Sequence, residues 1–510
     1  MDSQPQQPAH DVALHTRRAM FLLFGLVLAV FGISITFDFV NWDDPWYIHR
    51  NPLVQSWSFQ NLYGICTETV TRNFAPLTIF SYLIDHSLWG KWAGGYHLTN
   101  VLLHGINAVL VFLLVRQITT RHVFALVVAM LFAIHPIQIE SVVWISARKG
   151  LLSSTFILLS LLCWLKRERT SQDELSGTIL FVLALMCKAS AVVVPGIVFV
   201  YDIFVRRRSF ADSLARQFVS GLLAIWFILL TAGSQNSQTG GIRHHLGLNK
   251  LEILGIDAVL MWKYIGMLLW PTDLAILYDP AIQGIGLAIA ISVFAWGMIA
   301  VWIWKTRKSQ PLILFASLSA LALMFPVLNF FPLTTLMNDR YLYLPCIAFF
   351  ALMVAAVEYV YHLGVAGALS QRSPRSVESS GASAEAERPR HPRISNHTLN
   401  SQTSFRIAAV TSGLVVLTYS AISVQQMSVW RNDSALWKQA SQVSPELPVV
   451  QYQYALAEWR TGEHQAAITR LENALQLERV DDLDRERFNE KLQIFKTQFQ
   501  ELQLNAAVSK

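Results

Sequence analysis

Residues 19–47 read AMFLLFGLVLAVFGISITFDFVNWDDPWY, an apolar run that ends abruptly in an acidic and aromatic segment. The apolar part, Ala19 to Phe37, has the length that one membrane-spanning helix needs. Arg17 and Arg18 precede it and no small-residue cleavage site follows it, so the pattern predicts a retained first span and not a removed signal peptide. The acidic segment is therefore expected at the membrane surface.

The remainder of the chain repeats this apolar character. Of its 510 residues, 53% are hydrophobic and 15% are charged, a balance too apolar for an ordinary soluble protein. Ten or eleven spans would use roughly 220 residues, which excludes both a single-anchor protein and a pure bundle of spans. We expect an all-α polytopic membrane helix bundle of about eleven spans. The apolar runs place these near residues 19–37, 97–115, 123–139, 150–165, 176–187, 191–205, 214–232, 284–304, 312–330, 341–361 and 405–425.

Short clusters of Lys and Arg follow alternate spans and define the expected topology. Because positive residues favour the cytoplasmic side, the N-terminus is placed in the cytoplasm and the C-terminus outside it. This use of basic residues accounts for the net charge of +6, so no nucleic-acid partner is predicted. If segment 251–270 crossed the membrane, the basic clusters after it would lie outside the cytoplasm. We therefore expect this segment to form a re-entrant or interfacial helix at the outer face. The clusters are Arg17/Arg18, Arg116/Arg121, Lys166 to Arg169, Arg206 to Arg208, Lys305 to Lys308 and Arg372 to Arg393.

The chain divides into four expected parts. Residues 1–369 form the transmembrane domain, and residues 370–404, rich in Ser, Arg and Pro, form a disordered cytoplasmic linker. Residues 405–425 form the last transmembrane helix, and residues 426–510 form an extracytoplasmic helical tail.

Within the tail, small residues such as Gly462 and Ala467 recur at helical spacing between Pro445 and Asp481. This pattern is typical of a tetratricopeptide-like pair of antiparallel helices. Apolar residues at three- and four-residue intervals from Phe488 predict a capping helix. The tail can be interpreted as a protein-binding surface or as a structural cap.

The strongest polar signal is the pair Asp43 and Asp44, directly after the first span. Adjacent carboxylates at a membrane surface, flanked by interfacial aromatic residues, suit a general base or a metal ligand. The alternative is a solvated start of an acidic loop. The pair could bind a divalent cation, but no His or third carboxylate stands at ligand spacing, so no metal is predicted.

Further ionisable residues fall at the outer ends of expected spans. Charges near a membrane core are costly and often functional, although each alone is more often a snorkelling or helix-end residue. The basic ones suit a lipid phosphate, which Arg binds with a forked pair of hydrogen bonds and Lys meets as a point charge. The candidates are His135 and Glu140 at the end of the third span, Arg148 and Lys149 at the start of the fourth, Lys188 between the fifth and sixth, and Arg340 with Tyr341 at the start of the tenth.

These motifs occur together in an order that resembles a known family. They are Asp43-Asp44, His135-Pro136 with Glu140, Cys187-Lys188, Asp339 to Pro345, and Trp430-Arg431-Asn432-Asp433 before the tail repeat. On these residues the chain resembles the transmembrane and tetratricopeptide-repeat O-mannosyltransferase family, within the C-type glycosyltransferase superfamily. The resemblance covers nearly the whole chain apart from the linker.

The resemblance implies a polytopic enzyme of C-type glycosyltransferase architecture. Its donor would be a polyprenyl-phosphate sugar, with mannose as a candidate, and its acceptor an extracytoplasmic protein or glycan; no other cofactor is implied. The catalytic group would be Asp43, Asp44 and Glu140, with one Asp as the base and inversion as the outcome. The residues implied to bind the donor phosphate are Arg148, Lys149, Lys188 and Arg340.

Three positions depart from the family pattern. Ala75 stands where Arg is usual, Gly150 where an acidic residue commonly follows the basic pair, and Ala189 where Glu often follows Cys-Lys. Arg72 is a candidate replacement for the missing loop arginine. The departures favour a bacterial relative, in the inner membrane with its outer face in the periplasm. They also motivate an alternative, a non-catalytic membrane scaffold whose tail recruits a protein partner.

Overall fold

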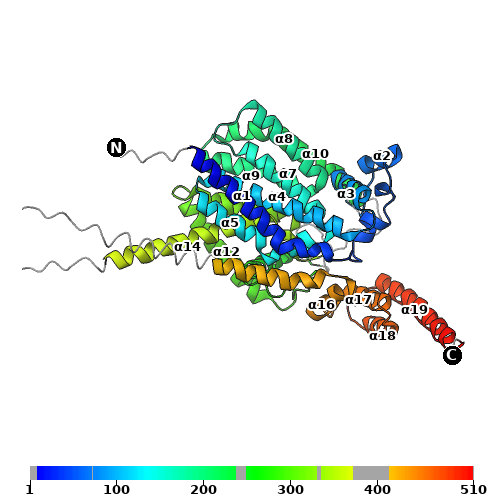
Figure 1. Cartoon of the computed structure of the whole chain (residues 1–510). Helices are drawn as coiled ribbons and strands as arrows, with labels where there is room; N and C mark the ends of the chain where they lie inside the picture. The colour runs from blue at the N-terminus through cyan, green and yellow to red at the C-terminus, as the bar shows by residue number, and fades with distance from the viewer. Residues whose placement is uncertain (1–8, 72, 237–247, 330–334, 371–412, 509–510) are drawn as a thin grey trace, which may run out of the picture.

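The computed structural model describes residues 9–71, 73–236, 248–329, 335–370 and 413–508. Within these ranges the regular elements are helices, and β-type pairing is limited to an isolated bridge between Val70 and Asn73. The prediction of an all-α protein is confirmed. Figure 1 shows a bundle of helices with the C-terminal helices extending from one end. The expected linker, apart from its first residue, lies outside the described ranges.

The described residues form a succession of helices along the chain. In order they are α1 (Ala9–Phe31), η1 (Gly32–Thr36), η2 (Pro45–His49), η3 (Pro52–Val54), α2 (Phe59–Thr67), α3 (Pro76–Trp89), α4 (Ala93–Thr119), α5 (His122–Ile134), η4 (Pro136–Gln138), α6 (Ile139–Val143), η5 (Ile145–Ala147), α7 (Arg148–Trp164), α8 (Ser171–Cys187), η6 (Ala189–Val193), α9 (Val194–Val200), η7 (Tyr201–Val205), α10 (Phe210–Asn236), α11 (Lys250–Leu269), α12 (Gly286–Thr306), α13 (Pro311–Met324), η8 (Phe325–Val327), η9 (Asp339–Leu342), α14 (Pro345–Ser370), η10 (Ser428–Trp430), α16 (Asp433–Val443), α17 (Pro448–Arg460), α18 (His464–Ala474) and α19 (Asp482–Val508). A further helix covers residues 413–427.

Five of the described helices are long and apolar enough to cross a membrane, or six if one bent pair counts as a span. Either number makes the chain a multi-pass membrane protein. Both are lower than the expected eleven because several expected spans fall on shorter apolar helices, at Ala189–Val205, Pro311–Val327 and Pro345–Tyr361. The five long helices are Ala13–Thr36, Ala93–Thr119, Ile145–Trp164, Phe210–Thr231 and Gly286–Thr306.

The third expected span, residues 123–139, is not one continuous helix. α5 ends at Ile134, and the next helical segment, Pro136–Val143, is bent by 55° from it. Pro136 explains the break, because its ring removes a backbone donor and disfavours a helical conformation at the residue before it. Glu140 therefore stands on a short segment beyond the bend and not on the span itself.

The segment expected to be re-entrant or interfacial forms the single helix α11. It is continuous over 20 residues, so it does not fold back on itself as a re-entrant hairpin would. The hydroxyl of Tyr264 accepts from the Asn338 N–H at 3.3 Å, and the carbonyl of Leu268 lies 3.1 Å from Nε2 of His135. Both contacts lie at the end of the bundle where the candidate polar residues are found.

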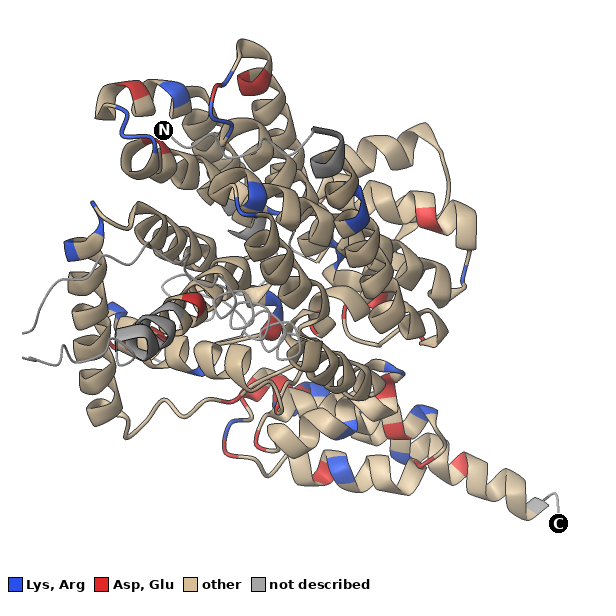
Figure 2. Cartoon of the chain, turned by 60° about the vertical axis from the view of Figure 1, so that its left-hand side comes forward, with Lys and Arg blue, Asp and Glu red and all other residues tan. Residues whose placement is uncertain are grey.

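The basic clusters between spans meet one another in space. Arg206 Nη2 donates to the carbonyl of Lys166 at 2.6 Å, and Arg207 Nη2 donates to the carbonyl of Lys308 at 3.4 Å. In Figure 2 the blue and red segments fall mainly near helix ends and on the C-terminal helices, while the bundle itself is largely tan. Three of the basic clusters therefore lie together, and the topology and orientation in the membrane stay predictions.

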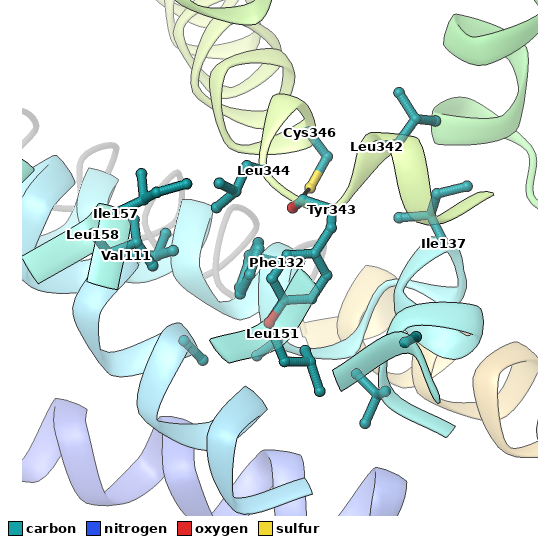
Figure 3. Close-up of a cluster of buried hydrophobic side chains, with 14 of the residues drawn as sticks. Val111, Phe132, Ile137, Leu151, Ile157, Leu158, Leu342, Tyr343, Leu344 and Cys346 are labelled. Carbon is teal, nitrogen blue, oxygen red and sulfur yellow. Dashed lines mark hydrogen bonds between the residues drawn. The ribbon is translucent and has the colours of Figure 1, made fainter. Parts of the chain in front are cut away.

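The segment that carries Arg340 is anchored in the apolar core. Tyr343 points between Phe132 and Leu151 in the cluster of Figure 3. Its hydroxyl accepts a 3.0 Å hydrogen bond from Asn107 Nδ2 and lies 2.9 Å from Nδ1 of His104. A buried hydroxyl with partners on α4 holds this segment in place, because leaving such a group unpaired in the core is costly.

The tail contains α16 to α19; α17 and α18 lie within the stretch expected to form a helix pair, and α19 covers the expected capping helix. The chain turns from α17 into α18 at Gly462, whose φ of +88° lies in the left-handed region that glycine adopts readily. The rings of Trp459 and Phe495 stack with centroids 3.9 Å apart and join α17 to α19. Its assignment as a tetratricopeptide-like domain stays a prediction.

Candidate functional site

Asp44 joins the loop after the first long helix to the turn that precedes α7. Its side chain is 1% exposed. Oδ2 accepts from the Val40 N–H at 3.0 Å, while Oδ1 accepts from the backbone N–H of Ser146 at 3.1 Å and from the Ser146 hydroxyl. Burial raises the pKa of Asp44 to about 7, although these hydrogen bonds oppose the shift. A carboxylate so enclosed suits an anchor for the loop.

Asp43 differs from its neighbour. It is half-buried, and its carboxylate has no hydrogen-bond or ion-pair partner among the described residues. Its backbone carbonyl accepts from the N–H groups of Trp46 at 2.9 Å and Tyr47 at 3.1 Å, which fixes the turn. Of the two acids, Asp43 is the one whose side chain is free to meet a substrate.

Glu140 and Arg340 form a buried ion pair. Glu140 Oε2 accepts from the backbone N–H of Arg340 at 2.8 Å, and Oε1 accepts from its guanidinium. Burial alone would lower the pKa of Arg340, but Glu140, with Tyr341 and Asp43, raises it. Because 21% of the Arg340 side chain is exposed, the paired guanidinium can still meet an anion on its open side.

Lys149 and Lys188 supply two further cations. Lys149 Nζ donates to the Tyr47 hydroxyl at 3.3 Å, and Lys188 has no hydrogen-bond or ion-pair partner in the part of the chain that the structure describes. Burial lowers the pKa of Lys188 to about 7, helped by the charges of Lys149 and Arg340. Lys149 and Arg340 therefore lie within electrostatic range of Lys188, and three cations in such range suit a phosphate.

Arg148 does not belong to this cationic group. It is fully buried and pairs with Asp85, with Nη1 of Arg148 2.5 Å from Oδ2. Nε donates to Asn100 Oδ1 at 2.8 Å, Nη2 donates to the Tyr96 carbonyl at 2.9 Å, and the guanidinium lies over the ring of Tyr82 at 4.5 Å. With its donors directed at the protein, Arg148 is placed to hold the start of α7 instead of a phosphate.

The remaining candidates are placed less centrally. Both ring nitrogens of His135 face backbone groups, since Nδ1 accepts from the Ile137 N–H at 3.1 Å while Nε2 faces Leu268, so this histidine stabilises the bend. The ring of Tyr341 lies 5.4 Å from the Arg340 guanidinium. Arg72 lies outside the described residues. Within the described ranges, no three His, Cys, Asp or Glu side chains are grouped so that they could hold a metal ion, and the expected absence of a metal stays a prediction.

Several residues that shape the site escaped the sequence analysis. Ser146 gives no sequence signal, because a small polar residue is unremarkable beside Arg148 and Lys149. Asp85 does give one, as a lone carboxylate within the apolar stretch 76–89. Tyr278 donates its hydroxyl to the buried Asp339 and so supports the residue before Arg340.

Comparisons with known proteins find relatives that are named as protein O-mannosyl-transferases. Protein O-mannosyl-transferase TMTC3 of Homo sapiens is 27% identical over 224 residues, which are 41% of this chain and 24% of the relative. Protein O-mannosyl-transferase TMTC1 of Mus musculus is 29% identical over 211 residues, 36% of this chain and 22% of the relative. Protein O-mannosyl-transferase tmtc2 of Xenopus laevis is 31% identical over 176 residues, 31% of this chain and 21% of the relative.

The chain is therefore similar to proteins named as O-mannosyl-transferases, as the order of its motifs predicts. The similarity spans about a quarter or less of the length of these relatives. No family model matches the chain, and no solved structure matches it. The three relatives are animal proteins, so they give no support to the expected bacterial origin.

Replacing Arg148 by Met should destabilise the protein by about 3–5 kcal/mol, because it leaves the Asp85 carboxylate buried without its partner. The double variant Arg148→Met/Asp85→Leu should recover much of this loss. Thermal unfolding in detergent measures both. If Arg148→Met kept normal stability but lost donor binding, Arg148 would bind the donor phosphate after all.

Asp44 should make stability depend on pH. Because its pKa is about 7 in the folded protein against 3.8 as the ordinary value, its contribution is full below about pH 4 and is lost as pH rises through 7. Relative to Asp44→Asn, the native protein should therefore lose unfolding temperature between these limits. A difference between the two proteins that stays constant with pH would contradict the raised pKa.

Proposed function

We propose that this chain is an integral-membrane glycosyltransferase that moves a sugar, with mannose as the candidate, from a polyprenyl-phosphate carrier to an extracytoplasmic acceptor protein or glycan. The observations that support it are the free carboxylate of Asp43, whose charge helps to raise the pKa of Arg340, and the nearby Lys188, whose pKa is lowered by Lys149 and Arg340. One base and a cluster of cations are what transfer from a lipid phosphate requires. The names of the relatives point to the same reaction class.

In the proposed reaction Asp43 removes the proton of the acceptor hydroxyl. The hydroxyl oxygen forms a bond to the anomeric carbon while the bond from that carbon to the phosphate oxygen breaks, so the sugar is inverted. The electron pair of the broken bond leaves with the carrier phosphate. Lys149, Lys188 and the open side of Arg340 stabilise this developing charge, and no acid is needed for a leaving group that is already a weak base.

The departures from the family pattern fit this proposal. A Cβ added to Gly150 would lie 3.9 Å from Nζ of Lys188, so an acidic side chain there would compete for this cation. With Gly at this position, Lys188 stays available for a donor phosphate. Ala75 is buried at the start of α3, where it carries no charge into the site.

The proposed orientation places the N-terminus in the cytoplasm and the tail outside. The first outer loop, the residues after α11 and the tail then share one compartment. Direct contacts join them, such as Asp38 N–H to the Arg431 carbonyl at 3.0 Å and Gln439 Nε2 to the Leu274 carbonyl at 2.9 Å. The acceptor and the lipid donor would meet on that side.

A groove in the tail favours a second candidate, a scaffold that recruits a protein partner. The groove measures about 490 Å³ and is lined by polar and apolar side chains, mostly of α18; the polar ones are Gln451 of α17 and Gln465, Thr469, Arg470 and Asn473 of α18. Turnover of a polyprenyl-phosphate sugar by the purified full chain distinguishes the two functions. A chain that retains a protein partner but never turns over donor would be a scaffold.

Asp43→Asn should abolish most transfer, with kcat lower by roughly 100- to 10,000-fold, because the amide cannot accept the acceptor proton. Asp38→Asn, in the same loop, is the matched control and should keep its activity. Transfer to an acceptor protein is measured together with the amount of protein in the membrane. Normal transfer by Asp43→Asn would exclude it as the base.

Donor binding should weaken as pH rises above about 7. Lys188 loses its charge in this range, since its pKa is lowered from 10.5 to about 7, and the KM for the donor should rise by at most about tenfold per pH unit. Lys188→Arg keeps its charge and should flatten the profile. Lys305→Arg, in a basic cluster away from the site, is the control, and a profile unchanged by Lys188→Arg would exclude Lys188 from the phosphate site.

A further inference from the structure

The tail is joined to the loop that carries Asp43. The backbone N–H of Asn41, two residues before Asp43, donates to Oδ1 of Asp433 at the start of α16. The side-chain amide of Asn41 lies 3.5 Å from Oε1 of Gln453 on α17. The loop is therefore attached to two tail helices immediately before its free acid.

Apolar contacts reinforce this attachment. The rings of Trp42 and Trp437 meet edge to face with centroids 5.2 Å apart, and Trp437 is 1% exposed. The ring centroids of Trp430 and Trp144 are 6.2 Å apart, and Trp144 lies two residues before Ser146 on the same turn. Aromatic pairs of this kind add stability beyond the area that they bury.

Asp433 is itself held in a fixed orientation. Its Oδ2 pairs with the Arg460 guanidinium, so that Oδ1 remains directed at Asn41. The first turn of α16 does not need the Asp433 side chain as its cap, because Asn432 Oδ1 already accepts from the Ala435 N–H at 3.0 Å. A carboxylate this close to a helix start, yet directed at another segment, has a role outside its own helix.

We infer that the tail positions the base: Asp433, held by Arg460, fixes the backbone at Asn41 and thereby sets the place of the Asp43 carboxylate. This inference rests on the proposed function. Asp43 lies between two anchors, the Asn41 bond to the tail and the Asp44 bonds to Ser146. With one anchor lost, the loop can pivot about the other, and a shift of about 1 Å in a reacting group can cost up to 100-fold in rate.

The test compares tail variants of the full chain. Asp433→Ala removes the acceptor and should lower kcat by about 10- to 100-fold, while the KM for the donor stays within about twofold because the phosphate-binding cations are untouched. Asp433→Asn keeps an oxygen acceptor and should restore most of kcat. Lys496→Met, which breaks an exposed ion pair with Glu472 elsewhere in the tail, is the matched control.

A merely structural role for Asp433 predicts another result. Loss of folding would reduce the amount of active protein in proportion, and the Asn variant would then give no selective rescue of kcat. If the Asp433→Ala protein does not accumulate in the membrane, Arg460→Met is tested in its place. This variant keeps the Asp433 acceptor but removes the guanidinium that orients it, so its kcat should be lower than that of the Lys496→Met control.

Failure of this inference is distinguishable from failure of the proposed function. A wild-type chain that transfers no sugar would contradict the proposed function. An active wild type whose Asp433→Ala variant, or Arg460→Met variant where the first does not accumulate, matches the control in kcat would overturn the positioning role. A raised donor KM with normal kcat would overturn it as well.

Discussion

The candidate site depends on the hydrogen bonds that Ser146 donates to the buried carboxylate of Asp44. They connect two segments that are about 100 residues apart in the chain, the loop after the first span and the turn that begins α7. This connection brings the acidic loop close to Lys149, which follows Ser146 by three residues and donates to the Tyr47 hydroxyl of the same loop. The ion pair between Arg148 and Asp85 also holds this turn, because Arg148 is the first residue of α7.

Charge pairing explains which residues are structural and which are free. A buried charge is tolerated only when it has a partner, and Arg148 with Asp85 and Glu140 with Arg340 follow this rule. Asp43 and Lys188 break it, since each lies at the site with no ion-pair or hydrogen-bond partner among the described residues. Unpaired charges of opposite sign in one region are what a reaction between a hydroxyl and a phosphate-linked sugar would use.

The sequence predicts these features to different depths. Apolar runs locate the long membrane helices but overcount them, since five or six of the eleven expected spans fall on described helices that are long and apolar enough to cross. The pair at Asp43 and Asp44 is visible without any structure. The separate roles of the two acids are not visible, since they depend on the distant Ser146. Likewise the two residues of the Arg148-Lys149 pair are chemically alike in sequence, and only their neighbours in space separate an anchor from a free cation. The break after α5 was missed although Pro136 signals it, because the apolar run continues across the proline.

The tail contacts extend this logic to both halves of the site. Asp433 reaches the acidic loop through Asn41, while Gln439 and Ser444 bind the carbonyls of Leu274 and Leu277, close to Tyr278. Tyr278 in turn donates to Asp339, the neighbour of Arg340. The loop that carries the proposed base therefore contacts the tail directly. The segment that carries Arg340 is connected to the tail through Tyr278 and the residues before it. A loop on a membrane protein gains a fixed geometry only from what packs on it, and here the tail supplies that support.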